Sequence, residues 1–293
     1  MSNYLIEPGC YGPRIVLTGA WSDSIATALA GIHVAELELN YAKGWRGKDL
    51  SFLSNFHKLK AFKIIDYAIQ SVEPVHILNQ LQRLEVMTYC KTELDFASFP
   101  SLEFCALQWR PKAASLFNSY SIQSLFLVGY SGKDCELFRG LLNLESLSIY
   151  SAPISNLLGL SGLGKLRTLR LANLRRLESL SGIENLSQLE ELDVHTCKAI
   201  GNIDAVAGLS HLRRLLLNDC GKIASLRPLE GLRDLDTLIF YESTDIVDGD
   251  LSGVFGRQPP PKMSFQNRKH YSHRREQLDS YNNSGQGGNG VGP

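Results

Sequence analysis

The chain has 293 residues, 44% of them hydrophobic and 20% charged, which excludes a protein that is disordered throughout. Lysine and arginine together number 30, as do aspartate and glutamate, so no net charge drives binding to nucleic acid or to an anionic membrane. No run approaches the roughly 18 consecutive apolar residues of a membrane span, and the first residues lack a secretory-signal pattern, so we expect a cytoplasmic protein without membrane contact.

The first predicted elements make up an N-terminal cap over residues 1–33. Alternating apolar residues predict a strand around residues 15–17. A helix is expected to begin near Asp23 and to place Ile25, Leu29 and Ile32 on its apolar face. These elements precede a repeat array and are expected to cover its first apolar face.

From residue 34 the chain repeats a block of the form L-x-x-L-x-L. Clear copies begin at Leu144, Leu166, Leu189, Leu212 and Leu235, with spacings of 22, 23, 23 and 23 residues. Weaker copies begin at Val34, Leu59, Leu81, Leu102 and Ile122. The period-two alternation within each block predicts a short strand whose leucines point inward and whose intervening residues face solvent. Stacking of the ten blocks predicts a repeat solenoid over residues 34–257.

This pattern resembles the leucine-rich repeat family, and segments such as "IGNIDAVAGLSHL" are similar to the 22-residue class of internalins and phosphatase-regulatory repeat proteins. The resemblance implies an α/β solenoid, a horseshoe with a concave parallel β-sheet and short helical or irregular convex returns. It also implies a binding protein rather than an enzyme. The corner position, eight residues after each block start, departs from the family pattern at Ala152 and Leu174 but holds Cys197 and Cys220. We therefore expect a less regular stack around the first two of these residues.

The segment "GLSGLGKL" at residues 159–166 matches the first part of a phosphate-binding loop. However, Lys165 precedes a predicted strand rather than a helix, and Leu166 stands where such a loop needs a Ser or Thr hydroxyl for magnesium. The same slot in later repeats reads "GIENLSQL" and "AVAGLSHL". We interpret the glycines as turn residues of a return segment and expect no nucleotide cofactor.

The solvent-facing positions of the predicted strands define a candidate partner-binding surface. Strands two to six present apolar side chains where a solvated sheet needs none, and later strands present charged ones. The candidate residues are Ile65, Met87, Tyr89, Phe104, Trp109, Phe126, Tyr130, Tyr150, Arg170, Asp193, His195 and Arg214. The alternative interpretation is that irregular middle repeats bury some of these aromatic side chains beneath loops or against one another.

Catalytic and metal sites are disfavoured by the placement of their candidate residues. Asp193 and His195 share a strand face with Ser148 two strands away, but an open sheet supplies neither desolvation nor an oxyanion site. His195 with Cys197, and the histidine pair in "HYSH", each offer two ligands where a tetrahedral metal site needs four. We predict no catalytic residue, metal, cofactor or small-molecule substrate.

The last predicted elements are a strand around residues 263–265 and a basic cap, within residues 258–278. The basic cluster consists of Arg268, Lys269, His270, His273, Arg274 and Arg275. Without a second nucleic-acid motif, we interpret it as a solvated cap. Residues 279–293 are expected to be disordered because they contain almost nothing to bury.

The sequence as a whole predicts a single-domain repeat protein that binds another protein through its concave face, as a scaffold or adaptor. Two alternatives stay open. One is an inhibitor of another protein, such as an immunity protein or antitoxin. The other is an exported effector or surface-recognition protein like the internalins, against which the absent signal pattern argues. The six cysteines show no paired spacing and are expected to be reduced.

Overall fold

The computed structural model describes residues 3–257 and 260–277, so the tail expected to be disordered lies outside the described residues. The contacts divide the chain into two compact units, Met1–Ser131 (unit 1) and Gly132–Pro293 (unit 2), where the sequence predicted a single domain. Each repeat of a solenoid contacts only its neighbours, so such a chain can be divided between repeats without cutting a shared core.

The sheet of unit 1 follows the order of the sequence, β1-β2-β3-β4-β5-β6-β7. Its strands are β1 (Tyr4–Pro8), β2 (Pro13–Leu17), β3 (Glu36–Asn40), β4 (Ala61–Ile65), β5 (Arg83–Met87), β6 (Phe104–Gln108) and β7 (Ser124–Val128). Strands β2 to β7 pair in parallel, whereas β1 pairs antiparallel with β2. The register is in phase, because Leu37 lies beside Phe62 and Phe62 beside Leu84. Inward side chains of successive repeats therefore stack in rows.

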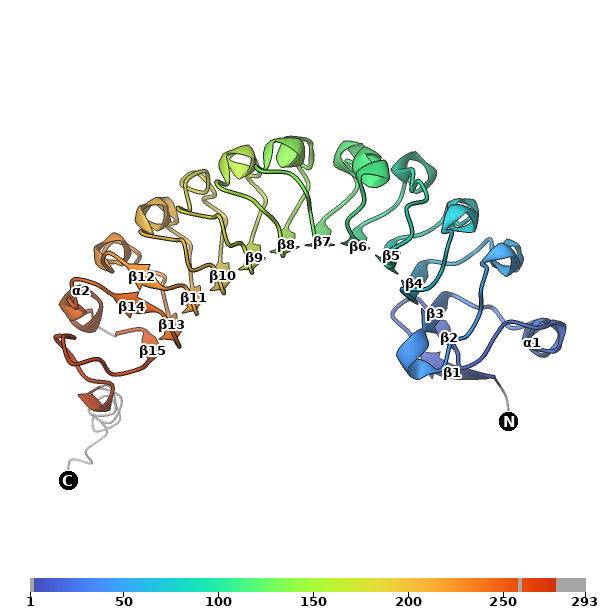
Figure 1. Ribbon diagram of the computed structural model, residues 1–293, viewed down its shortest axis with the longest axis horizontal. Helices are drawn as coiled ribbons and strands as arrows, with labels where there is room; N and C mark the ends of the chain where they lie inside the picture. The colour runs from blue at the N-terminus through green and yellow to red at the C-terminus, as the bar shows by residue number, and fades with distance from the viewer. Residues whose placement is uncertain (1–2, 258–259, 278–293) are drawn as a thin grey trace, which may run out of the picture. The chain divides into compact units, whose positions relative to one another are not determined.

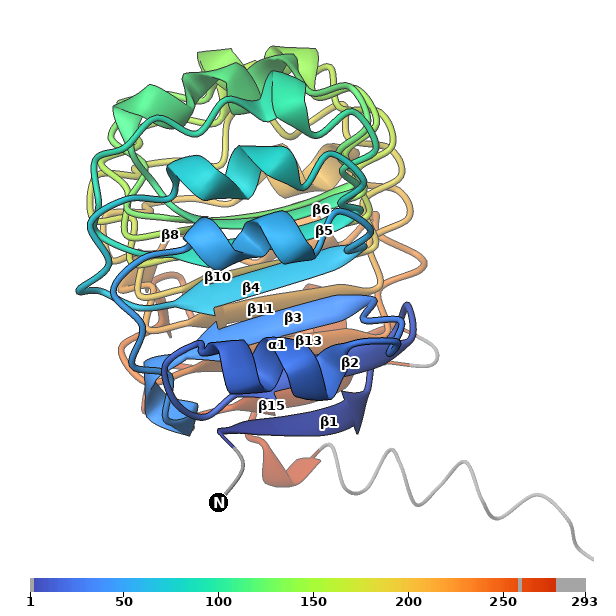
Figure 2. The same ribbon diagram turned by 90° about the vertical axis from the view of Figure 1, so that its right-hand side faces the viewer.

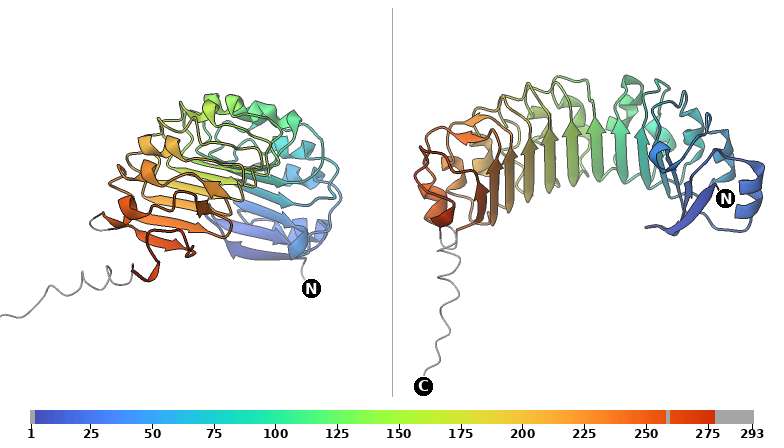
Figure 3. Two further views of the ribbon diagram at one scale, coloured as in Figure 1. Left: turned by 60° about the vertical axis from the view of Figure 1, so that its left-hand side comes forward. Right: turned by 60° about the horizontal axis from the view of Figure 1, so that its bottom comes forward.

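The sheet of unit 2 has the order β8-β9-β10-β11-β13-β15, and these strands run parallel to one another (Figure 3). They are β8 (Ser146–Tyr150), β9 (Thr168–Ala172), β10 (Glu191–His195), β11 (Arg214–Asn218), β13 (Thr237–Tyr241) and β15 (Lys262–Phe265). A separate parallel pair, β12 (Lys222–Ile223) and β14 (Asp245–Ile246), was not predicted from the sequence.

Short helical turns connect the strands. In unit 1 they are α1 (Asp23–Leu29), η1 (Tyr41–Lys43), η2 (Ser51–Asn55), η3 (Glu73–Ile77), η4 (Phe96–Ser98) and η5 (Pro111–Asn118). In unit 2 they are η6 (Glu136–Gly140), η7 (Leu158–Leu160), η8 (Asp204–Gly208), η9 (Arg227–Leu229) and α2 (Ser252–Phe255). Within each unit the strands of the main sheet lie on the inner side of a curve and most return segments on the outer side, where β12 and β14 of unit 2 also lie (Figure 1). In unit 1 the return helices stack one above another (Figure 2).

The core of each unit lies between the sheet and the return segments. In unit 2 the inward leucines of successive strands have no exposed surface: Leu147, Leu169, Leu192, Leu215 and Leu238. Their neighbours in the strands are at least partly exposed in most cases, which confirms the predicted alternation. The fold class is therefore the predicted α/β solenoid of leucine-rich repeats. No helix in the described residues is long and apolar enough to cross a membrane.

The N-terminal elements of unit 1 include one that the sequence analysis missed. Strand β2 spans the strand expected around residues 15–17, and α1 begins at Asp23. Ile25 and Leu29 are buried as expected, but Ile32 is 38% exposed, because α1 ends before it. The unpredicted strand β1 forms a hairpin with β2, closed by a hydrogen bond from Gly9 N to Gly12 O of 2.9 Å.

The corner after strands β8, β9, β10, β11 and β13 of unit 2 is regular, contrary to the expectation drawn from Ala152 and Leu174. Its first residue takes the left-handed conformation after five strands, with φ between 54° and 59°: Ser151, Asn173, Thr196, Asp219 and Glu242. The residue that follows is turned into the core, and Ala152 and Leu174 are buried there like Cys197 and Cys220. The backbone conformation, rather than a particular side chain, sets this corner.

The basic C-terminal segment of unit 2 is docked rather than fully solvated. Arg268 Nη2 donates hydrogen bonds to the carbonyl oxygens of Glu242 and Thr244, both at 3.0 Å. Arg268 and His270 also lie 3.1 and 3.2 Å from the Asp245 carboxylate. The solvated cap predicted for this cluster is thus wrong for Arg268, which is largely covered, whereas His270 stays exposed; both side chains fasten the segment to the preceding repeat.

Candidate binding surface on the sheet face

The Gly-Lys motif at residues 159–165 forms a turn and a close packing contact. Lys165 lies three residues before β9, and its Nζ donates a 2.7 Å hydrogen bond to Asn143 Oδ1. A Cβ added to Gly159 would lie 1.9 Å from the carbonyl oxygen of Cys135 in the preceding repeat. The helix that a phosphate loop requires after its lysine is replaced here by a strand.

On the sheet face of unit 1, Glu38 forms the centre of an ion-pair group. Its carboxylate lies 2.9 Å from Lys43 Nζ and 3.9 Å from Lys63 Nζ, and its side chain is 4% exposed. Burial alone would raise the pKa of Glu38, but hydrogen bonds from Lys43 and Asn40 and the charge of Lys63 outweigh it and lower the pKa. The sequence placed Glu38 among solvent-facing residues and missed that its partners bury it.

The ion pairs continue across the next strands. Lys63 Nζ lies 3.6 Å from Glu85 Oε2, and Arg83 Nη2 lies 2.8 Å from Glu85 Oε1. The Arg83 guanidinium carbon stands 3.5 Å from the centroid of the Phe104 ring, its cross-strand neighbour. The alternation of charge in one column, from Glu38 to Lys63 to Glu85, was a signal in the sequence from which the network could have been predicted.

Apolar side chains occupy several other face positions of unit 1. Ile65 and Met87 are half-buried neighbours in register on β4 and β5. Phe104 and Phe126, on β6 and β7, are also half-buried. These four candidate residues therefore lie on the outward face of the sheet, as the sequence predicted for the apolar part of the surface.

Three exposed tyrosines, here called the tyrosine row, continue this surface at the ends of β3, β4 and β5. Tyr41, Tyr67 and Tyr89 are 48%, 44% and 66% exposed. Their ring centroids are 5.9 Å apart for Tyr41 and Tyr67 and 4.6 Å apart for Tyr67 and Tyr89. Of these three, only Tyr89 was predicted from the sequence as a binding candidate; Tyr67 and Tyr41, which follows β3 directly in η1, were not.

Within the tyrosine row, Tyr67 and Tyr89 face outward because the corners after β4 and β5 differ from those of unit 2. Asp66 and Thr88 do not have positive φ; they are 7% and 1% exposed. Asp66 accepts a hydrogen bond of 3.0 Å from Trp45 Nε1, and Thr88 accepts one of 2.8 Å from Arg110. With the first corner residue turned inward, the second, which is a tyrosine, faces solvent.

Tyr130 was wrongly predicted to belong to the exposed surface, because it is 2% exposed. It follows Gly129, whose φ of 74° gives this corner the conformation that turns the next residue inward. Its ring centroid lies 5.2 Å from that of Trp109 and 5.9 Å from that of Phe117 in η5. Trp109 is partly exposed but also contacts Phe117, so for this pair the alternative of aromatic packing holds.

In unit 2 the sheet face carries charged side chains on β9, β10 and β11. Arg170 Nη2 lies 2.8 Å from Glu191, and Arg214 Nε lies 3.9 Å from the same carboxylate. Asp193 is adjacent in register to Arg170. Burial raises the pKa of Asp193, against the opposing effect of the Arg170 charge. Tyr150 is half-buried on β8, and His195 and Arg214 are exposed.

The structure does not bring Ser148, Asp193 and His195 together as a catalytic triad. Arg170 stands in register between Ser148 and Asp193, while His195 Nδ1 lies 2.8 Å from Thr196 Oγ1. His195 is exposed and Cys197 is fully buried, so the two side chains are not placed to bind one metal ion together. Over residues 3–257 and 260–277, no group of three or more His, Cys, Asp or Glu side chains is placed to hold a metal ion.

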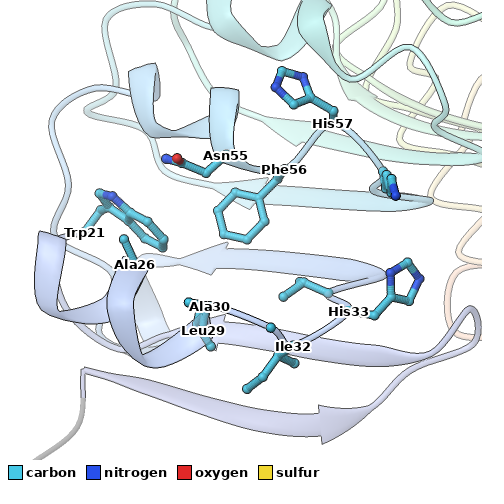
Figure 4. Close-up of a pocket in the computed structure, with 12 residues that line it drawn as sticks. Trp21, Ala26, Leu29, Ala30, Ile32, His33, Asn55, Phe56 and His57 are labelled. Atoms are coloured by element: carbon cyan, nitrogen blue, oxygen red, sulfur yellow. The ribbon is translucent and has the colours of Figure 1, made fainter.

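A pocket of about 400 Å³ lies at the N-terminal end of unit 1, between α1 and the residues after η2 (Figure 4). Trp21, Leu29 and Phe56 form its apolar lining, and His33 and His57 stand at separate places on its rim (Figure 4). The Trp21 ring is stacked on Phe52 with centroids 4.7 Å apart. This pocket follows the seam between the N-terminal helix and the first repeat, and no candidate residue lines it.

The in-register parallel strands, buried leucine rows and helical returns define a leucine-rich repeat protein by fold. The structure is similar to a leucine-rich repeat protein of Leptospira interrogans, with a TM-score of 0.61 and 22% identity over 78% of this chain and 59% of that chain. It is also similar to TLR13 in its complex with ssRNA13, with a TM-score of 0.52 and 16% identity over 88% of this chain and 46% of that chain. An internalin of Listeria monocytogenes matches with a TM-score of 0.49 and 18% identity, over 80% of this chain and 81% of its own.

The likenesses to the Leptospira protein and to TLR13 establish the fold, and the resemblance predicted from the repeat pattern is confirmed at that level. The matched region spans less than two thirds of the Leptospira protein and less than half of TLR13. No protein-family model and no curated protein matches the chain.

Proposed function

We propose that this chain is a non-enzymatic protein-binding module, a scaffold or adaptor, that recognises its partner through the sheet face of unit 1. The tyrosine row is the observation that carries the proposal. Three large side chains that are about half exposed or more, with their rings in a line, have no structural role that requires this exposure. Tyrosine combines a large contact area with few rotatable bonds, and it is enriched at the centres of protein interfaces.

The surroundings of the tyrosine row support a protein partner. Half-buried Ile65 and Met87 extend the apolar surface, and the ion pairs of Glu38, Lys63 and Glu85 provide a polar border. An apolar centre with a polar rim is the usual anatomy of a protein interface. The equal numbers of basic and acidic residues give RNA no general attraction, although the TLR13 structure contains one.

The finer alternatives belong to the same proposal. An inhibitor such as an immunity protein or antitoxin would use the same surface, and the identity of the partner would distinguish it from a scaffold. An exported effector would differ in location. Cytoplasmic location is part of what we propose, supported by six cysteines that are all unpaired, and fractionation of the native source tests it.

The proposal is tested by comparing two variants with the wild type in affinity capture from the native source. The first replaces Tyr41, Tyr67 and Tyr89 with alanine. The control replaces Leu137 and Leu158 with alanine; these side chains are 51% and 52% exposed on the return segments of unit 2. We expect proteins retained by the wild type and the control to be lost from the tyrosine variant, at an unchanged melting temperature. Equal capture by all three folded proteins would contradict the proposal.

A further inference from the structure

A second pocket of unit 1, of about 480 Å³, lies beyond the ends of β5 and β6 and contains a cysteine beside a buried arginine. The residues that line this pocket include Thr88, Cys90, Lys91, Arg110 and Lys112. Cys90 is partly exposed, whereas Arg110 is 4% exposed and reaches it from the following repeat. No established role accounts for a charge buried at this position.

Arg110 is a buried cation without a carboxylate partner. In the described part of the chain it forms no ion pair with Asp or Glu, and its Nε has no hydrogen-bond acceptor. Its Nη2 donates to Thr88 O at 3.2 Å and to Thr88 Oγ1 at 2.8 Å, and its Nη1 donates to Cys90 Sγ at 3.0 Å. A buried charge is costly unless it is compensated, and the Cys90 sulfur is the group in contact with it that can become an anion.

The hydrogen bonds around Cys90 favour the thiolate. Because Thr88 Oγ1 accepts from Arg110, its own proton is free to donate to Cys90 Sγ, which lies 3.3 Å away. The sulfur can thus accept one bond from a guanidinium and one from a hydroxyl. Burial would raise the pKa of the Cys90 thiol, but the bonds from Thr88 and the charge of Arg110 outweigh it and lower the pKa.

The buried cysteines show the opposite behaviour. Burial raises the pKa of Cys135 to about 12, of Cys197 to about 11 and of Cys220 to about 12. It also raises the pKa of Cys105, which is fully buried. Only Cys10 and Cys90 are not buried, so these two thiols are the accessible ones.

We propose that Cys90 is a thiol-modification site, held as a thiolate by Arg110 and Thr88, that reacts with small anionic disulfides. The reaction is thiol–disulfide exchange. The Cys90 thiolate attacks one sulfur of the reagent and forms a mixed disulfide; the reagent's own S–S bond breaks, and its other half leaves as a thiolate. No external oxidant is needed. The preference for an anion follows from exposed Lys91 and Lys112, because none of the residues that line the pocket is acidic.

The reaction can be followed with 5,5′-dithiobis(2-nitrobenzoate), an anionic disulfide, by released thiolate and by intact mass. Cys10→Ser leaves Cys90 as the accessible thiol, and Cys90→Ser leaves Cys10 as the matched control. At mildly acidic pH we expect the first variant to form one adduct at least about tenfold faster than the second, since the thiolate is the nucleophile. No adduct on Cys90, or a pH profile that coincides with that of Cys10, would overturn the proposal.

Two further variants, in the Cys10→Ser background, separate the thiolate's partners from general accessibility. Arg110→Met removes the charge but also replaces a buried, hydrogen-bonded side chain. Thr88→Val therefore serves as the shape-conserving variant that removes one donor. Each should shift the pH profile of Cys90 modification upward in a folded protein, and an unchanged profile in folded Thr88→Val would contradict the hydrogen-bond assignment.

The charge preference has its own test. The charged and titratable side chains that face Cys90 across the pocket are Arg110, Lys91, Lys112 and Tyr89. Replacing Lys91 and Lys112 with alanine should reduce the rate with the anionic disulfide severalfold and leave the rate with neutral 2-hydroxyethyl disulfide nearly unchanged. A wild-type rate that shows no salt dependence with the anionic reagent would count against the anion preference.

Discussion

Single residues on the two sheet faces experience opposite electrostatic effects. The Glu38 carboxylate is buried among partners that stabilise its charge, so its pKa is lowered. Asp193 is also removed from water, but the Arg170 charge does not offset its burial, so its pKa is raised. Neither effect could be predicted from the sequence, because each depends on how far neighbouring side chains cover the carboxylate.

Replacing Asp193 with Asn should raise the melting temperature at neutral pH. A raised pKa means that the ionised form is less stable in the folded chain than in the unfolded one. This cost is fully present above the folded pKa and vanishes below the ordinary value of 3.8, where both states are protonated. Thermal melts of Asp193→Asn and the wild type should therefore converge as the pH is lowered from about 7 toward 3.

Glu38→Gln should behave in the opposite way and serves as the matched comparison. Its lowered pKa contributes stability above the ordinary value of 4.5, which is lost as the pH falls through the folded pKa. The variant should melt below the wild type at neutral pH, with the difference shrinking in acid. If both substitutions shifted the melting temperature in the same direction at neutral pH, one of the two assignments would be wrong.

Two of the three glycines of the phosphate-loop-like segment should respond differently to alanine. A Cβ on Gly159 would overlap the Cys135 carbonyl oxygen at 1.9 Å, whereas one on Gly164 would meet nothing within 4 Å. We expect Gly159→Ala to lower the free energy of unfolding by about 1–3 kcal/mol and Gly164→Ala to change it little. Urea unfolding measures both, and equal costs would contradict the close contact between the repeats.

At the scale of elements, the leucine spacing was sufficient to predict the ten repeat strands of the main sheet and their register, but not the separate pair β12 and β14. It could not predict β1, which lies outside the repeat, or the corners, which depend on backbone conformation. The positive φ of Gly129 buries Tyr130, whereas the buried side chains of Asp66 and Thr88 turn the next tyrosine outward. Thr88 and Arg110 are 22 residues apart, which is one repeat length. The register of the repeats could therefore have indicated that Arg110 lies beside Thr88.

The register itself is tested by alanine substitutions along one row. Leu169, Leu192 and Leu215 are fully buried at the same strand position, so each change should cost roughly 2–5 kcal/mol by leaving a cavity. Arg214 is exposed and adjacent in sequence to Leu215, so its replacement with alanine should change the free energy of unfolding by no more than about 0.5 kcal/mol. Chemical denaturation of the four variants measures these costs, and a reversed order would mean that the strands are displaced by one residue.

At the scale of the whole molecule, the two units present different surfaces. The sheet face of unit 1 carries the tyrosine row and half-buried apolar side chains, and that of unit 2 carries Arg170, Asp193 and Arg214. The sequence predicted apolar candidates on strands two to six and charged ones on later strands, so its apolar group also included Tyr150, which lies on β8 in unit 2. It did not show that Tyr130 is buried and that Trp109 packs against Phe117, so alanine at either position should cost stability as well as surface.

The central claim is that the tyrosine row anchors a protein partner. Its most direct test is the dissociation constant of the captured partner for Tyr89→Ala, measured together with the melting temperature and compared with Leu137→Ala. We expect Tyr89→Ala to weaken binding by about 2 kcal/mol, some thirtyfold, at an unchanged melting temperature. The control should bind like the wild type. Wild-type affinity in Tyr89→Ala, with the loss appearing instead in Leu137→Ala, would contradict the claim and place the binding surface on the return segments.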